Sequence, residues 1–207
     1  MTTQRKAKLE RKSKETEIKV DLNIDGQGKT KIKTPIGILS HMLELFAFHG
    51  LFDLKLEVKG DTHIDIHHTN EDIGIVLGKA FKEALKDKKG IKRFGSGFAP
   101  MESTLGQTVI DISGRGYLKL SVLGSQPIPE TKENRYTFQN LEHFLESFAH
   151  QLGANMIVTI NNPMNSTADL HTMMETVFKS FGLALDQATQ IDPRRKSAVP
   201  STKGIID

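Results

Sequence analysis

Two histidines and two carboxylates fall within the six residues His67-His68-Thr69-Asn70-Glu71-Asp72, the densest run of reactive side chains in the chain. If a helix begins near His67, then Glu71 lies four residues later on the same face and three residues after His68. Two imidazoles and a carboxylate on one helical turn suit a divalent metal such as manganese, zinc, iron or nickel. The motif alone fits a solvated helix start equally well, because acidic residues complement a helix N-terminus.

The same pattern recurs in the second half of the chain, and this recurrence favours metal binding. Each half contains a histidine, a second histidine 26 or 28 residues later and a glutamate four residues after that: His41, His67 and Glu71, then His143, His171 and Glu175. Solvated helix starts would not require such a repeat. We interpret the histidines outside the pattern as ordinary exposed or core residues: His49, His63 and His150.

Hydrophobic periodicity predicts the elements that position the first set of these residues. Alternating apolar residues predict a β-hairpin over 17–24 and 29–34, followed by a helix over 37–50 that carries His41. A strand over 54–59 and a return strand at 64–66 then lead into a second helix that ends near residue 90. The predicted order of the first half is therefore ββαββα.

The second half predicts the same order of elements. Its hairpin covers 108–113 and 117–123, and its first helix carries His143 and stops at Gly153. A strand over 156–160 and a short return segment lead to the closing helix, which ends before residue 193. The sequence thus predicts an α+β fold built from internally duplicated ββαββα units.

Composition limits the chemistry that is open to this chain. Its 207 residues contain no cysteine, so disulfides, thiolate metal sites and cysteine nucleophiles are excluded, and any metal ligands come from His, Asp and Glu. No apolar run approaches the roughly 20 residues that span a bilayer, and no hydrophobic signal segment begins the chain. We therefore expect a soluble, cytoplasmic protein without a membrane partner.

Charge is concentrated at the N-terminus. Residues 1–14 contain six Lys or Arg against one Glu, a net charge of +5, which leaves −2 for the remainder because the total is +3. The body of the chain is thus nearly neutral, with no Trp and few aromatic residues for base stacking, so we expect no nucleic-acid partner. We interpret residues 1–14 as a basic segment that is either a mobile leader or a contact for a neighbouring subunit.

From about Arg11 to the C-terminus the chain resembles the imidazoleglycerol-phosphate dehydratase family. The motifs that carry the resemblance occur in one order: Glu15-Thr16, His41-Met42-Leu43, Gly60-Asp61, Asp65, His67-His68-Thr69, Glu71-Asp72, Arg93-Phe94-Gly95-Ser96, Pro100-Met101, Asp111-Ile112-Ser113-Gly114-Arg115, Glu175, Phe178-Lys179 and Pro200-Ser201-Thr202-Lys203-Gly204. The resemblance implies a two-layer α/β sandwich of the ribosomal protein S5 domain 2-like type. It also implies a homo-oligomeric shell of 24 subunits with active sites between subunits.

The resemblance further implies a reaction and a set of site residues. Such enzymes remove water from imidazole glycerol phosphate to give imidazole acetol phosphate in histidine biosynthesis, with two Mn²⁺ per active site. The implied metal ligands are His41, His67, His68, Glu71, His143, His171 and Glu175. The implied catalytic groups are Glu15, Glu71, Glu175 and Lys179, and the implied contacts to the substrate phosphate are Arg93, Arg115, Ser201 and Lys203.

Several residues depart from the family pattern. Thr172 stands where the family has the second histidine of a pair, which predicts that one metal site lacks a protein ligand. Ser40 and Leu45 replace a usual Asp and Gln, and Asp169 replaces a usual Asn. These departures motivate one alternative, a divergent and catalytically weak or inactive oligomeric relative that binds metal or ligand. A di-metal hydrolase is a further alternative.

These patterns predict four parts of the chain. They are the basic N-terminal segment 1–14, the first half 15–92, the second half 93–190 and a substrate-binding C-terminal tail 191–207.

Overall fold

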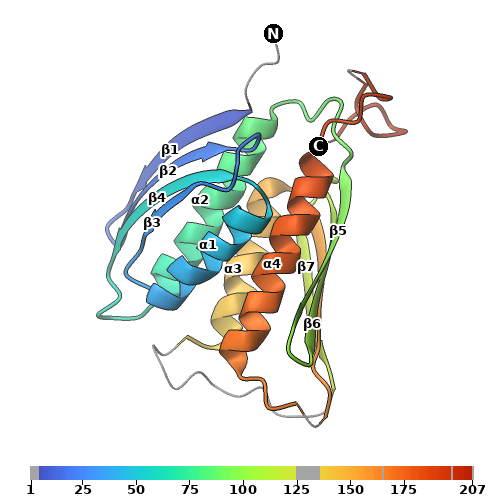
Figure 1. The fold of residues 1–207 in the computed structure, drawn as a ribbon. Coiled ribbons are helices and arrows are strands. Elements are labelled where there is room, and N and C mark those ends of the chain that lie inside the picture. The colour runs from blue at the N-terminus through green and yellow to red at the C-terminus, as the bar shows by residue number, and fades with distance from the viewer. Residues whose placement is uncertain (1–4, 125–135, 165, 197, 207) are drawn as a thin grey trace.

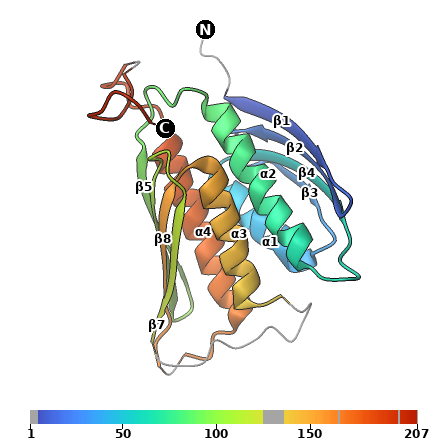
Figure 2. The ribbon, with the colours of Figure 1, turned by 180° about the vertical axis from the view of Figure 1, so that it is seen from behind.

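A computed structural model describes residues 5–124, 136–164, 166–196 and 198–206 of the chain. Within these residues, four helices lie between two four-stranded sheets (Figures 1 and 2). The first unit contains β1 (Lys6–Lys12), β2 (Thr16–Asn23), β3 (Thr30–Lys33), α1 (Gly37–His49), β4 (Asp53–Gly60) and α2 (His67–Leu85). The second contains β5 (Phe94–Met101), β6 (Thr104–Asp111), β7 (Tyr117–Leu123), α3 (Phe138–Leu152), β8 (Asn155–Asn161) and α4 (Leu170–Thr189).

The duplication and the layered α+β architecture predicted from the sequence are confirmed. Each unit packs its two helices on one face of its own sheet, and the helix layers of the two units meet in the middle. The expected apolar positions form one continuous buried core. At its centre Phe46 contacts Phe52, Phe81, Phe148 and Phe181, with ring centroids 4.6–6.3 Å apart. Because these rings come from both units, the halves share one core.

The strand order differs from the prediction, because each unit is βββαβα rather than ββαββα. The segment 64–66 is not a strand, and Ile64 is 70% exposed. The additional strand comes first in each unit. In the first unit it is β1, which pairs with β2 along its whole length. Residues 6–12 of the basic N-terminal segment therefore belong to the sheet. This edge strand alternates lysines with few apolar residues, which hides its strand character in the sequence.

The predicted hairpins are also wrong. The sheet orders are β1-β2-β4-β3 and β5-β6-β8-β7, so β4 lies between β2 and β3, and β8 lies between β6 and β7. β3 pairs with β4 in parallel, and β7 pairs with β8 in parallel. Parallel neighbours need a crossover rather than a tight turn. The crossovers are α1 and α3, which carry the first histidine of each half.

Glycines allow the helices of the two units to approach closely. A Cβ at Gly74 or Gly78 of α2 would lie 2.6 or 2.5 Å from a carbonyl oxygen of α3, and one at Gly182 of α4 would lie 2.4 Å from the carbonyl oxygen of Phe46 in α1. Backbone therefore contacts backbone between α2 and α3 and between α1 and α4. As a result, each unit's first helix lies beside the second helix of the other unit.

Candidate metal centres and phosphate site

The first cluster of metal-ligating side chains joins α1 to the first turns of α4. The Nε2 atoms of His41 and His171 lie 3.2 and 3.1 Å from Oε1 of Glu175. The two imidazole rings stack with centroids 5.5 Å apart and an interplanar angle of 24°. One ligand atom from each of the three residues falls within 4.8 Å of the others. Two nitrogens and one carboxylate oxygen that converge in this way fit a divalent cation.

Glu175 carries the negative charge of this cluster. Its second oxygen accepts a hydrogen bond of 2.6 Å from Nζ of Lys179, one helical turn later. Burial raises the pKa of Glu175, but the hydrogen bonds from Lys179, His41 and His171 lower it more, and the resulting pKa is about 2. Glu175 is therefore ionised at neutral pH, as a metal ligand must be.

A second cluster joins α2 to α3. Nδ1 of His143 lies 3.2 Å from Nδ1 of His67, and Nε2 of His67 lies 3.7 Å from Oε2 of Glu71. These three side chains line a cavity of about 240 Å³ together with Glu146 and Ser147. The sequence prediction missed Glu146, although a signal was available. Glu146 follows His143 by three residues, as Glu44 follows His41, so the repeat could have revealed it.

The structure regroups the two sequence sets across the halves. The sequence placed His41 with His67 and Glu71, and it placed His143 with His171 and Glu175. In the structure, His41 instead lies with His171 and Glu175, and His143 lies with His67 and Glu71. The close packing of α1 on α4 and of α2 on α3 produces this exchange. Two clusters that each combine residues of both halves therefore replace the grouping by sequence half.

His68 contacts the ring of His67, with centroids 5.9 Å apart, and its Nδ1 faces two carboxylates. Its Nδ1 lies 3.6 Å from Oδ2 of Asp61 and 3.9 Å from Oε2 of Glu15. Among the described residues, this Nδ1 and Oδ1 of Asp61 are buried polar atoms without a hydrogen-bond partner. The structure therefore brings Glu15 and His68 together and adds Asp61, which was not predicted as a site residue. A carboxylate beside one ring nitrogen commonly orients the other nitrogen toward a metal.

The departures from the family pattern have local structural roles. Asp169 caps α4, because its Oδ1 accepts a hydrogen bond of 2.8 Å from the backbone N–H of Thr172. The hydroxyl of Ser40 lies 2.9 Å from that of Thr34. Leu45 packs against the core. Because position 40 is a serine rather than the usual aspartate, the residue next to His41 offers no carboxylate. The carboxylate that contacts His41 is that of Glu175.

Arg93 joins the second sheet to the C-terminal tail. Its Nε and Nη2 donate to Asp111 at 2.6 and 3.0 Å, and its Nη1 donates to the carbonyl of Pro200 at 2.9 Å. Three of its five N–H donors are thus in use, which leaves two for a ligand. The tail continues into Ser201, whose Oγ accepts a hydrogen bond of 3.2 Å from the backbone N–H of Lys203.

The remaining member of the predicted phosphate set is Arg115. It is exposed in the turn between β6 and β7, where its N–H donates to Oγ of Ser113. This turn follows directly after Asp111 of β6, the residue to which Arg93 is bonded. Arg93, Arg115 and the tail therefore belong to one end of the second sheet.

The phosphate set and the first metal cluster lie at opposite ends of α4 within one chain. The backbone N–H of Arg93 bonds to the carbonyl of Ala188, whereas Glu175 is in the second turn of the same helix. Ala188 follows Glu175 by 13 residues, and at 1.5 Å per residue this corresponds to about 20 Å. The candidate phosphate residues and the first candidate metal cluster of one chain are therefore widely separated along α4.

Comparison with known proteins identifies the family. The family model described as imidazoleglycerol-phosphate dehydratase matches residues 34–185. The chain belongs to the imidazoleglycerol-phosphate dehydratase family. It is 49% identical over 200 residues to the imidazoleglycerol-phosphate dehydratase of Geobacter metallireducens, covering 97% of this chain and 98% of the relative. It is 48% identical over 202 residues to that of Geobacillus kaustophilus, covering 98% and 99%.

Solved structures of imidazoleglycerol-phosphate dehydratases have the same fold. The crystal structure of the Staphylococcus aureus enzyme matches with a TM-score of 0.74 and 30% identity, over 90% of this chain and 99% of that one. The structure from Pyrococcus furiosus, in complex with (S)-C348, matches with a TM-score of 0.76 and 32% identity, over 95% and 99%. These matches support a dehydratase of this family, and they do not favour the alternative of an inactive relative.

Proposed function

We propose that this chain is the subunit of a dehydratase that converts imidazole glycerol phosphate into imidazole acetol phosphate in histidine biosynthesis. Its membership of the imidazoleglycerol-phosphate dehydratase family carries the proposal. In this reaction a carbon-bound proton is removed and a hydroxyl leaves as water, without oxidation or reduction of the substrate as a whole. The site must therefore supply acid, base and charge-stabilising groups rather than a redox cofactor.

Two Mn²⁺ ions per active site fit the available donors. His41, His171 and Glu175 would hold one ion, and His67, His143 and Glu71 would hold the other. His68 would add a seventh ligand through the ring nitrogen that does not face Asp61. Ligand atoms around one ion lie about 3–4.4 Å apart, so small side-chain shifts would complete the first cluster. When bound, the ions supply charge stabilisation to the imidazole ring and orient the hydroxyls of the substrate.

The carboxylates divide into two kinds of environment. Glu175 is ionised and bonded to Lys179, which suits charge stabilisation and the positioning of the reacting end of the substrate. The side chains of Glu15 and Glu71 are 52% and 45% exposed, so both remain accessible for moving a proton. We propose all four side chains as catalytic groups, with Glu15 and Glu71 as the accessible acid and base.

The phosphate of the substrate requires cationic donors. We propose Arg93, Arg115, Ser201 and Lys203 for this role. Arg93 would act in two ways, because it ties down the tail through Pro200 and keeps two N–H donors for the phosphate.

The separation between the metal cluster and the phosphate set within one chain supports the proposal that a second chain completes the active site. A metal cluster from one subunit and a phosphate set from another would bring both ends of the substrate into contact with protein. We therefore propose a homo-oligomer, of 24 subunits as the family resemblance implies. The exposed face of the second sheet offers an apolar surface for such contacts, made of Phe94, Phe98, Val109, Tyr117, Leu123 and Ile157.

Co-expression of two variants with strongly reduced activity tests the proposal that two subunits form one active site. Glu175→Gln removes a metal ligand and Lys203→Ala removes a phosphate contact, so each variant alone should lose about 100-fold in kcat/KM with Mn²⁺. If one site takes its metal cluster and its phosphate set from two subunits, co-expressed variants should regain activity in about a quarter of the sites of a random assembly. Formation of imidazole acetol phosphate measures the recovery.

A matched pair separates the reaction from the assembly. Co-expressed Glu175→Gln and His171→Gln, which both damage the metal cluster, should regain nothing. If the unmodified protein with Mn²⁺ forms no product, the proposed reaction is wrong. If it forms product but the first mixture recovers no activity despite a mixed assembly, the reaction stands and the site lies within one chain.

A further inference from the structure

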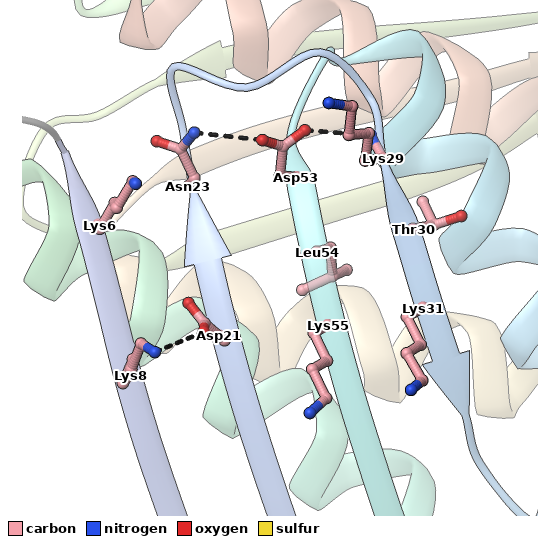
Figure 3. Close-up of a pocket in the computed structure, with 10 residues that line it drawn as sticks. All are labelled: Lys6, Lys8, Asp21, Asn23, Lys29, Thr30, Lys31, Asp53, Leu54 and Lys55. Atoms are coloured by element: carbon pink, nitrogen blue, oxygen red, sulfur yellow. Dashed lines mark hydrogen bonds and ion pairs between the residues drawn. The ribbon is translucent and has the colours of Figure 1, made fainter.

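The outer face of the first sheet holds a basic pocket that shares no residue with the metal clusters or the phosphate set. Its cavity has a volume of about 370 Å³, and all four strands line it (Figure 3). Five lysines line the pocket: Lys6, Lys8, Lys29, Lys31 and Lys55. Only two carboxylates accompany them, so the lining has a net charge of +3, which equals the formal net charge of the whole chain.

The two carboxylates already have partners. Asp21 pairs with Nζ of Lys8 at 2.8 Å. Asp53 accepts hydrogen bonds from the backbone N–H groups of Gln27 and Lys29 at 2.8 and 3.1 Å and from the side-chain amide of Asn23 at 3.3 Å. Figure 3 shows Asp21 turned toward Lys8, and Asp53 turned toward Asn23 and Lys29. Glu57, which lies outside the lining, pairs with Nζ of Lys55 at 3.5 Å. Among the described residues, Lys6, Lys29 and Lys31 of the pocket have no ion pair with a carboxylate.

Two of these lysines face one another across neighbouring strands. Lys31 of β3 is the direct register partner of Lys55 of β4, and Figure 3 shows their side chains side by side. Like charges directly opposite each other in a sheet are destabilising. On the rest of this face the register alternates in sign, as in the pairs Glu10 with Lys19 and Lys19 with Glu57. The Lys31–Lys55 pair breaks that alternation. Lys55 also has Asp21 opposite it on β2 and Glu57 beside it, whereas Lys31 has no such ion pair among the described residues. A bound anion would therefore compensate Lys31 most.

The chemistry of the pocket indicates what it binds. Its ammonium groups are point charges on flexible stems, which suit phosphate oxygens without the fixed fork of an arginine. The described lining contains no aromatic side chain on which a base could stack, which disfavours nucleic acid. The volume is in the range of small-molecule sites. We propose that this pocket is a second, non-catalytic site for a compact anion that carries two phosphate groups, held between Lys31 and Lys55 and flanked by Lys6 and Lys29.

Calorimetric titration with fructose 1,6-bisphosphate tests the proposal, because this probe carries two phosphate groups on a small frame. The protein is loaded with Mn²⁺ and carries Arg115→Gln, which weakens binding at the substrate site. Lys31→Gln or Lys55→Gln in this background should weaken binding about tenfold, because each removes a charged hydrogen-bond donor. Lys12→Gln is the control, since it makes the same charge change on the same face but outside the pocket.

A second readout covers the free protein. Lys31→Gln should leave the Tm without ligand unchanged or raised, because it removes the repulsion, and it should reduce the rise in Tm that the bisphosphate produces. The proposal is overturned if the Arg115→Gln protein does not bind the probe. It is also overturned if Lys12→Gln weakens binding as much as Lys31→Gln, because attraction to the whole charged face would then explain the affinity.

Discussion

At the scale of single residues, Glu175 organises the chemistry of the first cluster. It contacts two histidines through one oxygen and Lys179 through the other, and these three partners come from both halves of the chain. Lys179 keeps the carboxylate ionised, while the two histidines arrange their nitrogens around it. A single carboxylate thus links the two histidines, which are candidate metal ligands, to the Lys179 ammonium group that we propose near the reacting end of the substrate.

The substitution Thr172→His tests whether a metal site of this chain lacks a protein ligand. Thr172 is the repeat counterpart of His68, and its backbone N–H is held by Asp169. Because that bond uses only the backbone, Thr172→His should keep the cap of α4 and add an imidazole beside His171. We expect tighter Mn²⁺ binding by about tenfold, or more Mn²⁺ per subunit, in a metal titration.

Thr30→His on the outer face of the first sheet is the control for an added imidazole away from the metal clusters and the phosphate set, and it should leave the Mn²⁺ titration unchanged. If Thr172→His also leaves it unchanged, another group already completes the site, and the departure at Thr172 is without consequence for metal loading.

At the scale of elements, the contacts between helices decide which residues meet. α2 approaches α3 at Gly74 and Gly78, and α4 approaches α1 at Gly182. These contacts place His143 beside His67 and His41 beside Glu175. The glycines carry no reactive group themselves, yet the geometry of both clusters depends on the close approach that they allow.

Gly78→Ala should destabilise the protein and disturb the second cluster. The new Cβ would lie 2.5 Å from the carbonyl oxygen of Phe148, so α2 and α3 would have to separate. We expect a loss of about 1–3 kcal/mol in the free energy of unfolding, together with weaker metal binding. Denaturant unfolding and a Mn²⁺ titration measure the two effects.

Gly37→Ala is the matched control for that variant. Gly37 is also helical, but no atom lies within 4 Å of the position that its Cβ would take, so alanine should be neutral or stabilise by up to about 1 kcal/mol. Equal stability of the two variants would mean that the contact between α2 and α3 has room to adjust.

At the scale of the whole molecule, the two sheets present different outer faces. The first is covered by charged residues that mostly alternate in sign, and the second exposes aromatic and aliphatic side chains. The halves therefore share a fold but differ in surface chemistry. The apolar face suits contact with another copy of the chain, whereas the charged face suits solvent and small anions. Among the described residues, no helix has both the length and the apolar character to cross a membrane.

Phe98→Lys should weaken the assembly of subunits. Phe98 is 54% exposed on the apolar sheet face, so a lysine there should be tolerated by the fold but would place a charge in the proposed contact. We expect smaller particles by light scattering and a parallel loss of activity. Phe48→Lys is the control, because Phe48 is 61% exposed on α1 and away from this face. Particles of unchanged size for Phe98→Lys would mean that the subunits meet elsewhere.

The sequence by itself determined the duplication, the helices and the repeated pattern of candidate ligands. These follow from local periodicity and from a repeated spacing of His and Glu, both of which are readable without knowledge of packing. Its motifs also identified the family, which the comparisons confirm. The individual site residues, the part boundaries, Mn²⁺, the subunit number and the cytoplasmic location stay predictions.

Only the tertiary structure decided how these parts combine. The strands β1 and β5 escaped prediction, because one is rich in lysine and the other contains two glycines that lie against α4. The parallel pairing of β3 with β4 depends on a crossover that no turn motif reveals. The exchange of histidines between halves depends on backbone contacts between distant helices. Spacing along the chain specifies which histidines and glutamates are candidate ligands, and packing between the units specifies which of them meet.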